Sequence, residues 1–147
     1  MKYTRTSSLP LSQRLVNEYG NFLGQTNWTF YCTLSTRNPL SVKSAQRYIE
    51  RTHEQLQTSY NLKTQLYWVA EPFDSKYGFH LHCLVKFDST EPHKYKKELI
   101  KAWQVVTKGC YGKKYNWTSI VPYNATLGGR FYVVKWIGRN DVEYGFL

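Results

Sequence analysis

Apolar residues at every second position predict strands in three segments, residues 27–35, 64–71 and 78–87. Successive side chains of a strand point to opposite faces, so each segment has one face suited to a core. The apolar faces consist of Trp28, Phe30, Cys32 and Leu34 in the first segment, Leu66, Trp68 and Ala70 in the second, and Phe79, Leu81, Cys83, Val85 and Phe87 in the third. The last two segments follow each other closely and therefore predict an antiparallel hairpin.

Apolar residues at helical spacing predict helices over residues 11–23, 40–60, 89–109 and 126–140. Ser41 is the expected N-cap of the second helix, and Ser89 or Thr90 that of the third, with Pro92 in its first turn. Less regular strands are expected over 115–123 and 142–147. This order predicts an α+β fold, a ferredoxin-like or RRM-like split β-α-β domain over residues 1–147. We expect a five-stranded antiparallel sheet with helices mainly on one face.

The amino-acid composition indicates which kind of partner the chain binds and in which cellular compartment it is expected. The 147 residues carry 20 Lys and Arg against 10 Asp and Glu, a net charge of +10, and 17% are aromatic. Such a surplus favours a nucleic acid, and exposed aromatic residues suit stacking on unpaired bases. The three cysteines show no C-x-x-C pairing, so neither disulfides nor structural zinc are expected. No apolar run reaches the length of a membrane span and no signal peptide is apparent, so a cytoplasmic protein is expected, with no membrane partner.

The polar faces of the three strands gather residues suited to metal binding. They present Thr29, Tyr31, Thr33, Glu71, His80 and His82. Both imidazoles can turn onto one ion, and Glu71 can add a carboxylate oxygen from the neighbouring strand. Coordination positions would remain for water and substrate, as a catalytic ion requires. With a phosphate in the shell, Mn²⁺ or Mg²⁺ is the expected ion. The same set could hold Fe²⁺ or Zn²⁺, or it could be an ordinary polar surface.

A second constellation lies in "GGRFYVVKWIG", where Tyr132 and Lys135 are three residues apart and would share one face of a helix. A phenol is a weak nucleophile near neutral pH. A metal acting on a phosphate and a neighbouring ammonium would both favour its attack. Simple helix packing of Tyr132, with Lys135 as a solvated charge, is the alternative.

Three motifs resemble the HUH endonuclease superfamily, in particular the rolling-circle replication initiators of plasmids and small viruses. "FYCTLST" at 30–36 is similar to the first motif, "EPFDSKYGFHLHCLV" at 71–85 to the metal motif, and "YVVKW" at 132–136 to the Tyr-x-x-Lys motif. The resemblance implies that Glu71, His80 and His82 bind the divalent ion. It also implies that Tyr132 attacks a phosphodiester, giving a 5′-phosphotyrosyl link and a free 3′-hydroxyl, while Lys135 positions the phosphate or the ion.

The residue four positions after Tyr132 is Trp136, so the chain resembles the single-tyrosine group. Tyr144 is a distant candidate for a second nucleophile. The implied activity is nicking and joining of single-stranded or hairpin origin DNA, with a polymerase and a helicase supplied by the host. Predicted DNA contacts are Tyr31, Arg37, Lys43, Arg47, Lys76, Tyr77 and Lys86. A related transposase or relaxase, a metal-free RRM-like binding module and a metal-dependent oxygenase are the alternatives.

Overall fold

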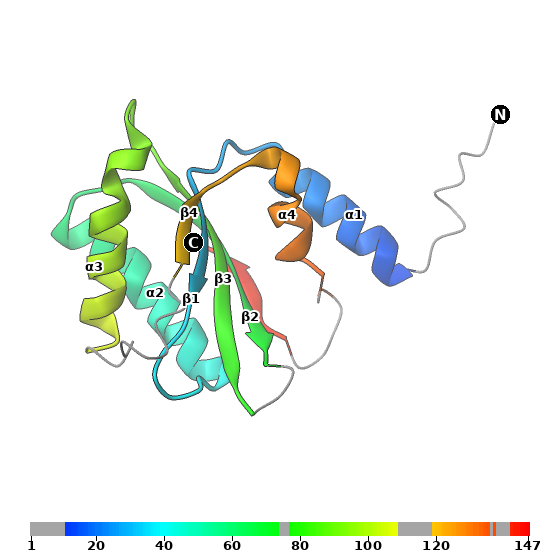
Figure 1. The fold of residues 1–147 in the computed structure, drawn as a ribbon, viewed down its shortest axis with the longest axis horizontal. Helices are drawn as coiled ribbons and strands as arrows, with labels where there is room; N and C mark the ends of the chain where they lie inside the picture. Colours follow the sequence, from blue (N-terminus) through cyan, green and yellow to red (C-terminus); the bar gives the residue numbers. More distant parts are fainter. Residues whose placement is uncertain (1–10, 74–76, 109–118, 136, 138–141) are drawn as a thin grey trace.

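The computed structural model of the chain describes residues 11–73, 77–108, 119–135, 137 and 142–147, in which helices flank a single sheet (Figure 1). The elements in chain order are α1 (Leu11–Leu23), β1 (Phe30–Leu34), α2 (Val42–Ser59), β2 (Thr64–Pro72), β3 (Phe79–Phe87), the 3₁₀ helix η2 (Pro92–Tyr95), α3 (Lys96–Val106), β4 (Ser119–Pro122), the 3₁₀ helix η4 (Ala125–Leu127), α4 (Gly129–Tyr132) and β5 (Tyr144–Phe146). The predicted α+β fold class is confirmed.

The sheet has five strands in the order β4-β1-β3-β2-β5, and each neighbouring pair is antiparallel. Since β1 and β2 both run antiparallel to β3, they are parallel to each other with β3 between them, and α2 connects them. The same relation holds for β3 and β4, which flank β1. Two such split β-α-β units make up the ferredoxin-like arrangement that the sequence predicts.

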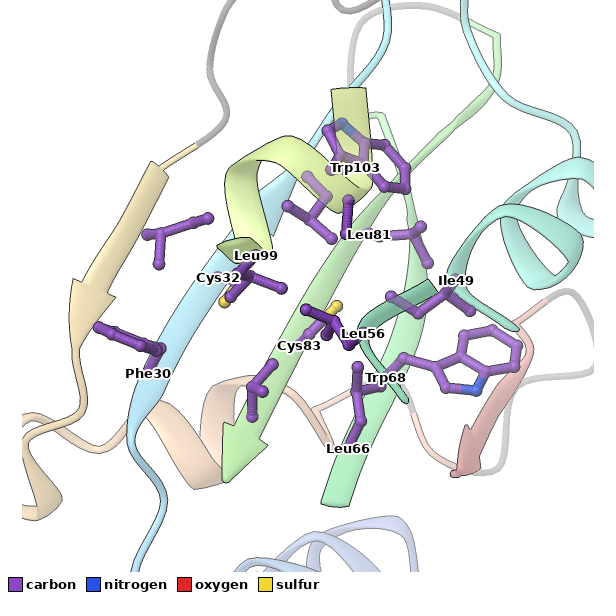
Figure 2. Packing of buried hydrophobic residues seen from close by; sticks show 14 of the residues in the cluster. Phe30, Cys32, Ile49, Leu56, Leu66, Trp68, Leu81, Cys83, Leu99 and Trp103 are labelled. Carbon is purple, nitrogen blue, oxygen red and sulfur yellow. The ribbon is translucent and has the colours of Figure 1, made fainter. Parts of the chain in front are cut away.

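One core lies between the sheet and the helices α2 and α3. Figure 2 shows its members Phe30, Cys32, Ile49, Leu56, Leu66, Trp68, Leu81, Cys83, Leu99 and Trp103. Apart from Ile120 of β4, the strand residues of this cluster are among those assigned to the apolar faces by alternation. Ser41 caps α2 as predicted, since its hydroxyl accepts a hydrogen bond of 3.1 Å from the Ser44 N–H.

A second, smaller core covers part of the opposite face of the sheet, where α1 and α4 lie side by side (Figure 1). Tyr67, Val69 and Leu84 contribute to it from the strands, and Val133 and Val134 from the turn after α4. Beyond this core, the end of the face nearest the β2–β3 turn carries Glu71 and the two histidines.

Two residues lie elsewhere than the alternation predicts, because the regular strand begins at Phe30 and not at residue 27. Trp28 belongs to the second core and not the first. Thr29 is buried, and its hydroxyl accepts a hydrogen bond from the backbone N–H of Phe87. Thr29 therefore has a structural role and is not part of the polar site.

The helix predicted over residues 126–140 is much shorter in the structure. Gly128 adopts a left-handed conformation with φ of 73° and separates η4 from α4, which ends at Tyr132 and continues as a turn. The third predicted helix begins with η2, and Ser89 accepts a hydrogen bond from Glu91 N instead of capping α3. Residues 109–118, 136 and 138–141 lie outside the described part. Within the described residues, no helix has the length and apolar character needed to cross a bilayer.

Candidate active site

The pairing of β2 with β3 brings the three predicted metal ligands together. Glu71 lies directly opposite His80, and His82 is two residues further along β3 on the same face, opposite Val69. Glu71 and His82 are buried, with 6% and 5% of their surfaces exposed, while His80 is half-buried. The hairpin therefore holds a carboxylate and two imidazoles at a protected end of the sheet.

The candidate ligand atoms converge on a common point. Glu71 Oε2 contacts the Nε2 atoms of both histidines, at 3.4 Å from His80 and closer to His82. The two Nε2 atoms are 2.9 Å apart. Adjacent ligands of an octahedral ion with bonds of about 2.1 Å lie about 3 Å from each other. One carboxylate oxygen and two imidazole nitrogens at these separations could hold a divalent metal ion.

Hydrogen bonds from β1 orient His82 for this role. Its Nδ1 atom lies 3.2 Å from the Tyr31 hydroxyl and 3.3 Å from the Thr33 hydroxyl. When Nδ1 carries the proton and donates to these oxygens, Nε2 keeps a free lone pair that faces Glu71 and His80. Outer partners of this kind fix the tautomer and orientation of metal-binding histidines. The Nδ1 atom of His80 is buried with no such hydrogen bond among the described residues.

The charge states of the group suit a cation. Burial alone would raise the pKa of Glu71, but its interactions with His80, His82 and Lys135 outweigh burial and hold the pKa well below the usual range. Burial lowers the pKa of His82 more than Glu71 raises it. At neutral pH the group therefore offers a carboxylate and a neutral imidazole, which are the forms that bind metals.

Tyr132 and Lys135 meet the other oxygen of the same carboxylate. The Tyr132 hydroxyl donates a hydrogen bond of 3.2 Å to Glu71 Oε1, and Lys135 Nζ lies 2.8 Å from that atom. Lys135 Nζ is also 3.7 Å from the centroid of the Tyr132 ring. Tyr132 is 41% exposed, so a substrate can reach it. Interactions with Glu71 and Tyr132 raise the pKa of Lys135 although burial opposes them, which keeps the side chain an ammonium.

Close packing against α1 and β2 sets the position of α4 and of Tyr132. A Cβ atom at Gly20 of α1 would lie 2.2 Å from a ring carbon of Phe131, so the contact needs a glycine there. The buried Tyr67 hydroxyl donates a hydrogen bond of 3.3 Å to the carbonyl of Val133, directly after α4. These contacts hold a helix that is too short to be stable alone.

One of the residues predicted to contact DNA lies at this site, and most of the others lie elsewhere. Tyr31 lies beside His82, whereas Tyr77 is 90% exposed at the β2–β3 turn and Arg37 is exposed after β1. Lys43 and Arg47 lie on α2, which packs on the opposite face of the sheet. Lys86 is near the far end of β3, and Lys76 lies outside the described residues.

Two further points concern the predicted second nucleophile and a contact of His82 that was not predicted. Trp136 lies outside the described residues, and Tyr144 packs in β5 against the rings of Tyr19 and Tyr67. The contact of Thr33 with His82 was not predicted, although alternation placed Thr33 on the correct face. Its register with His82 across β1 and β3 becomes apparent only in the paired sheet.

Comparison of the chain with known protein families, characterised proteins and solved structures gave no match. Functional assignment therefore depends on the motifs and on the geometry of the site.

Proposed function

We propose that the chain is a metal-dependent nickase and strand transferase of the HUH type that acts on single-stranded DNA. The observation that carries the proposal is the shared carboxylate of Glu71. One of its oxygens accepts a hydrogen bond from Tyr132, and the other contacts both His80 and His82. A nucleophile is thereby connected directly to a group that could hold a metal.

Mn²⁺ or Mg²⁺ is the proposed ion, held by Glu71, His80 and His82. A carboxylate and two imidazoles occupy only part of an octahedral shell, which leaves room for water and a phosphate oxygen. When bound, the ion supplies Lewis acid chemistry that polarises the phosphate. The remaining steps belong to side chains of the protein.

In the proposed reaction the Tyr132 oxygen attacks the phosphorus of a phosphodiester. A bond between the phenol oxygen and phosphorus forms, and the bond from phosphorus to the 3′-oxygen breaks. The proton lost by the phenol balances the one gained by the leaving 3′-oxygen. The products are a 5′-phosphotyrosyl link and a free 3′-hydroxyl. Because one ester replaces another, the reverse joining reaction is accessible to the same site.

Two neighbours of Tyr132 have separate proposed roles. Glu71 Oε1 accepts the phenol hydrogen bond and so aims the oxygen, whereas Lys135 Nζ at 3.7 Å from the ring centroid stabilises the negative charge that develops on the phenol. The net charge of +10 favours binding of the DNA backbone. Initiation of rolling-circle replication, with a polymerase and a helicase from the host, is the biological role that fits a nick with a free 3′-hydroxyl.

A denaturing gel tests the proposal. The full chain is incubated with Mn²⁺ and a pool of single-stranded oligonucleotides of randomised sequence, labelled at the 3′ end. Tyr132 retains the 3′ portion of the cleaved strand, so we expect a labelled band that is heavier than the protein by this DNA fragment and that disappears on protease digestion.

The band should be absent in Tyr132→Phe and present in Tyr77→Phe, a matched change at an exposed tyrosine of the β2–β3 turn. A band that persists in Tyr132→Phe would assign the nucleophile to another residue. A pool that stays intact with Mn²⁺ and with Mg²⁺ would contradict the nickase proposal.

A further inference from the structure

A cavity of about 270 Å³ opens directly beside Tyr132, between β1, β4 and the segment that leads into α4. Its lining residues include Tyr31, Val121, Tyr123, Leu127, Gly129 and Tyr132, together with Pro122 and Asn124. Tyr31 and Tyr132 also belong to the candidate active site. A ligand in this cavity would therefore lie next to the phosphate that Tyr132 is proposed to attack.

The walls of the cavity suit a flat, uncharged ring. They are mainly aromatic and aliphatic, and among the described residues that line the cavity there is no lysine, arginine, aspartate or glutamate. Its volume lies below the roughly 300–1,000 Å³ typical of pockets for drug-sized ligands. A phosphate would find no charge partner in it, whereas a single heterocycle would find tyrosine rings on which to stack.

Gly129 keeps the space between two of these rings open. A Cβ atom at this position would lie 3.0 Å from Cδ2 of Tyr31 and 3.9 Å from Cε2 of Tyr123. Any larger residue would place its side chain between the two tyrosines. The glycine thus preserves a gap into which a planar group can enter.

The Tyr123 hydroxyl is buried, so a ligand in the cavity meets the ring of Tyr123 and not its hydroxyl. A nucleobase offers both of its ring faces for stacking on such side chains.

We propose that this cavity binds one unpaired nucleobase of the DNA strand, from a nucleotide that neighbours the phosphate attacked by Tyr132. The inference rests on the proposed function and adds a base-recognition site to it. The base enters between Tyr31 and Tyr123, and Leu127 covers it from the solvent side. The backbone of the same nucleotide then passes Tyr132.

Photocrosslinking locates the base without knowledge of the cleavage sequence. The full chain is bound to a single-stranded homopolymer of 5-iododeoxyuridine, irradiated, and mapped by peptide mass spectrometry. We expect a crosslink at Tyr123 or Tyr31. It should fall about 5-fold or more in Gly129→Ala, in line with the loss of one base stacked on an aromatic side chain.

Affinity measurements with the same homopolymer complete the test. Leu127 is 79% exposed, so Leu127→Ala removes one wall without disturbing the core. We expect this variant to bind the homopolymer more weakly but an abasic strand of equal length as well as the unaltered chain. Val105→Ala, at a 49% exposed residue of α3 on the opposite face, is the control and should bind both strands normally.

The outcomes separate this site from the nickase activity. Crosslinks confined to other residues, or equal homopolymer binding by Leu127→Ala, Gly129→Ala and the unaltered chain, would overturn the base site while leaving the phosphotyrosyl adduct intact. Crosslinks at Tyr123 without any Tyr132 adduct would retain the base site and overturn the nickase. A chain that binds no single strand would overturn both. Mn²⁺ binding by Leu127→Ala should be unchanged, because Leu127 is 79% exposed and neither binds nor orients a metal ligand.

Discussion

At the scale of single residues, Glu71 connects the two halves of the candidate site. Its Oε2 contacts the imidazoles of β3, and its Oε1 contacts Tyr132 and Lys135. A carboxylate can serve both sides because each oxygen accepts more than one hydrogen bond or ion contact. Loss of this one side chain should therefore affect metal binding and tyrosine orientation together.

Glu71→Gln tests whether Glu71 binds the metal. The amide keeps the shape of the side chain but removes its charge and replaces one acceptor oxygen with a donor. We expect the affinity for Mn²⁺ to fall by more than the roughly 10–100-fold that loss of an outer partner causes, because Glu71 is a direct ligand. Isothermal titration calorimetry measures the change.

Glu54→Gln, on an exposed position of α2, removes the same charge away from the site and should bind Mn²⁺ normally. Equal Mn²⁺ affinity in both variants would exclude Glu71 as a ligand.

Tyr31→Phe tests how His82 is oriented. The change removes the hydroxyl 3.2 Å from Nδ1 and leaves Thr33 at 3.3 Å as the remaining partner. We expect Mn²⁺ affinity to fall by about 10-fold, the lower end for outer partners, because one hydroxyl still holds the tautomer. In the Tyr31→Phe, Thr33→Val double variant the loss should approach about 100-fold. A double variant with unaltered affinity would show that neither hydroxyl orients the ligand.

At the scale of elements, the metal ligands and the nucleophile depend on different parts of the fold. Glu71, His80 and His82 lie on the paired strands β2 and β3, which the first core supports. Tyr132 lies at the end of α4, which depends on α1 and the second core. A change in α1 should therefore affect the chemistry of Tyr132 without affecting the metal.

Gly20→Ala makes such a change. In a helix interior alanine is normally favoured over glycine by about 1 kcal/mol, but here the added Cβ would lie 2.2 Å from the Phe131 ring. The overlap should displace α4, so formation of the phosphotyrosyl adduct should slow by about 10-fold or more while Mn²⁺ affinity stays constant. The yield of adduct against time measures the rate of adduct formation, and calorimetry measures the Mn²⁺ affinity.

Gly24→Ala is the matched comparison for Gly20→Ala. Its Cβ would meet the guanidinium end of Arg130, at 2.5 Å from one terminal nitrogen, and this flexible group can move aside. Adduct formation should remain near normal in this variant. If both variants formed the adduct at the same rate, the packing of Phe131 on α1 would not position Tyr132.

At the scale of the whole molecule, local pattern predicted the first core and the metal group because both depend on regular strands. Alternation alone assigns Glu71, His80 and His82 to one face, and hairpin pairing brings them together. The second core was not predicted, since Tyr67, Val69 and Leu84 look compatible with either an open or a covered face until α1 and α4 are placed.

The cavity beside Tyr132 also could not be predicted from the sequence. Its walls come from β1, β4, η4 and the start of α4, and no single period connects Tyr31 with Tyr123 and Leu127. The extent of α4 was mispredicted for a related reason. Gly128 is compatible with a helix in a pattern, but its φ of 73° ends one turn and begins another. Such features depend on tertiary contacts, which override local preference.

The stability of the whole domain should report on the metal independently of any DNA chemistry. A ligand that binds only the folded state stabilises it by about 2.7 kcal/mol at a concentration 100 times its Kd. For a domain of this size about 1 kcal/mol corresponds to roughly 2–4 °C in Tm. Scanning calorimetry with Mn²⁺ at that concentration should therefore show a rise of roughly 5–11 °C. The three ligands are far apart in an unfolded chain, so metal binding to the unfolded state should offset little of this rise.

The rise in Tm should vanish in Glu71→Gln and persist in Tyr132→Phe, because the Tyr132 phenol is the proposed nucleophile and not a metal ligand. An equal rise in Glu71→Gln would mean that Mn²⁺ binds elsewhere on the protein.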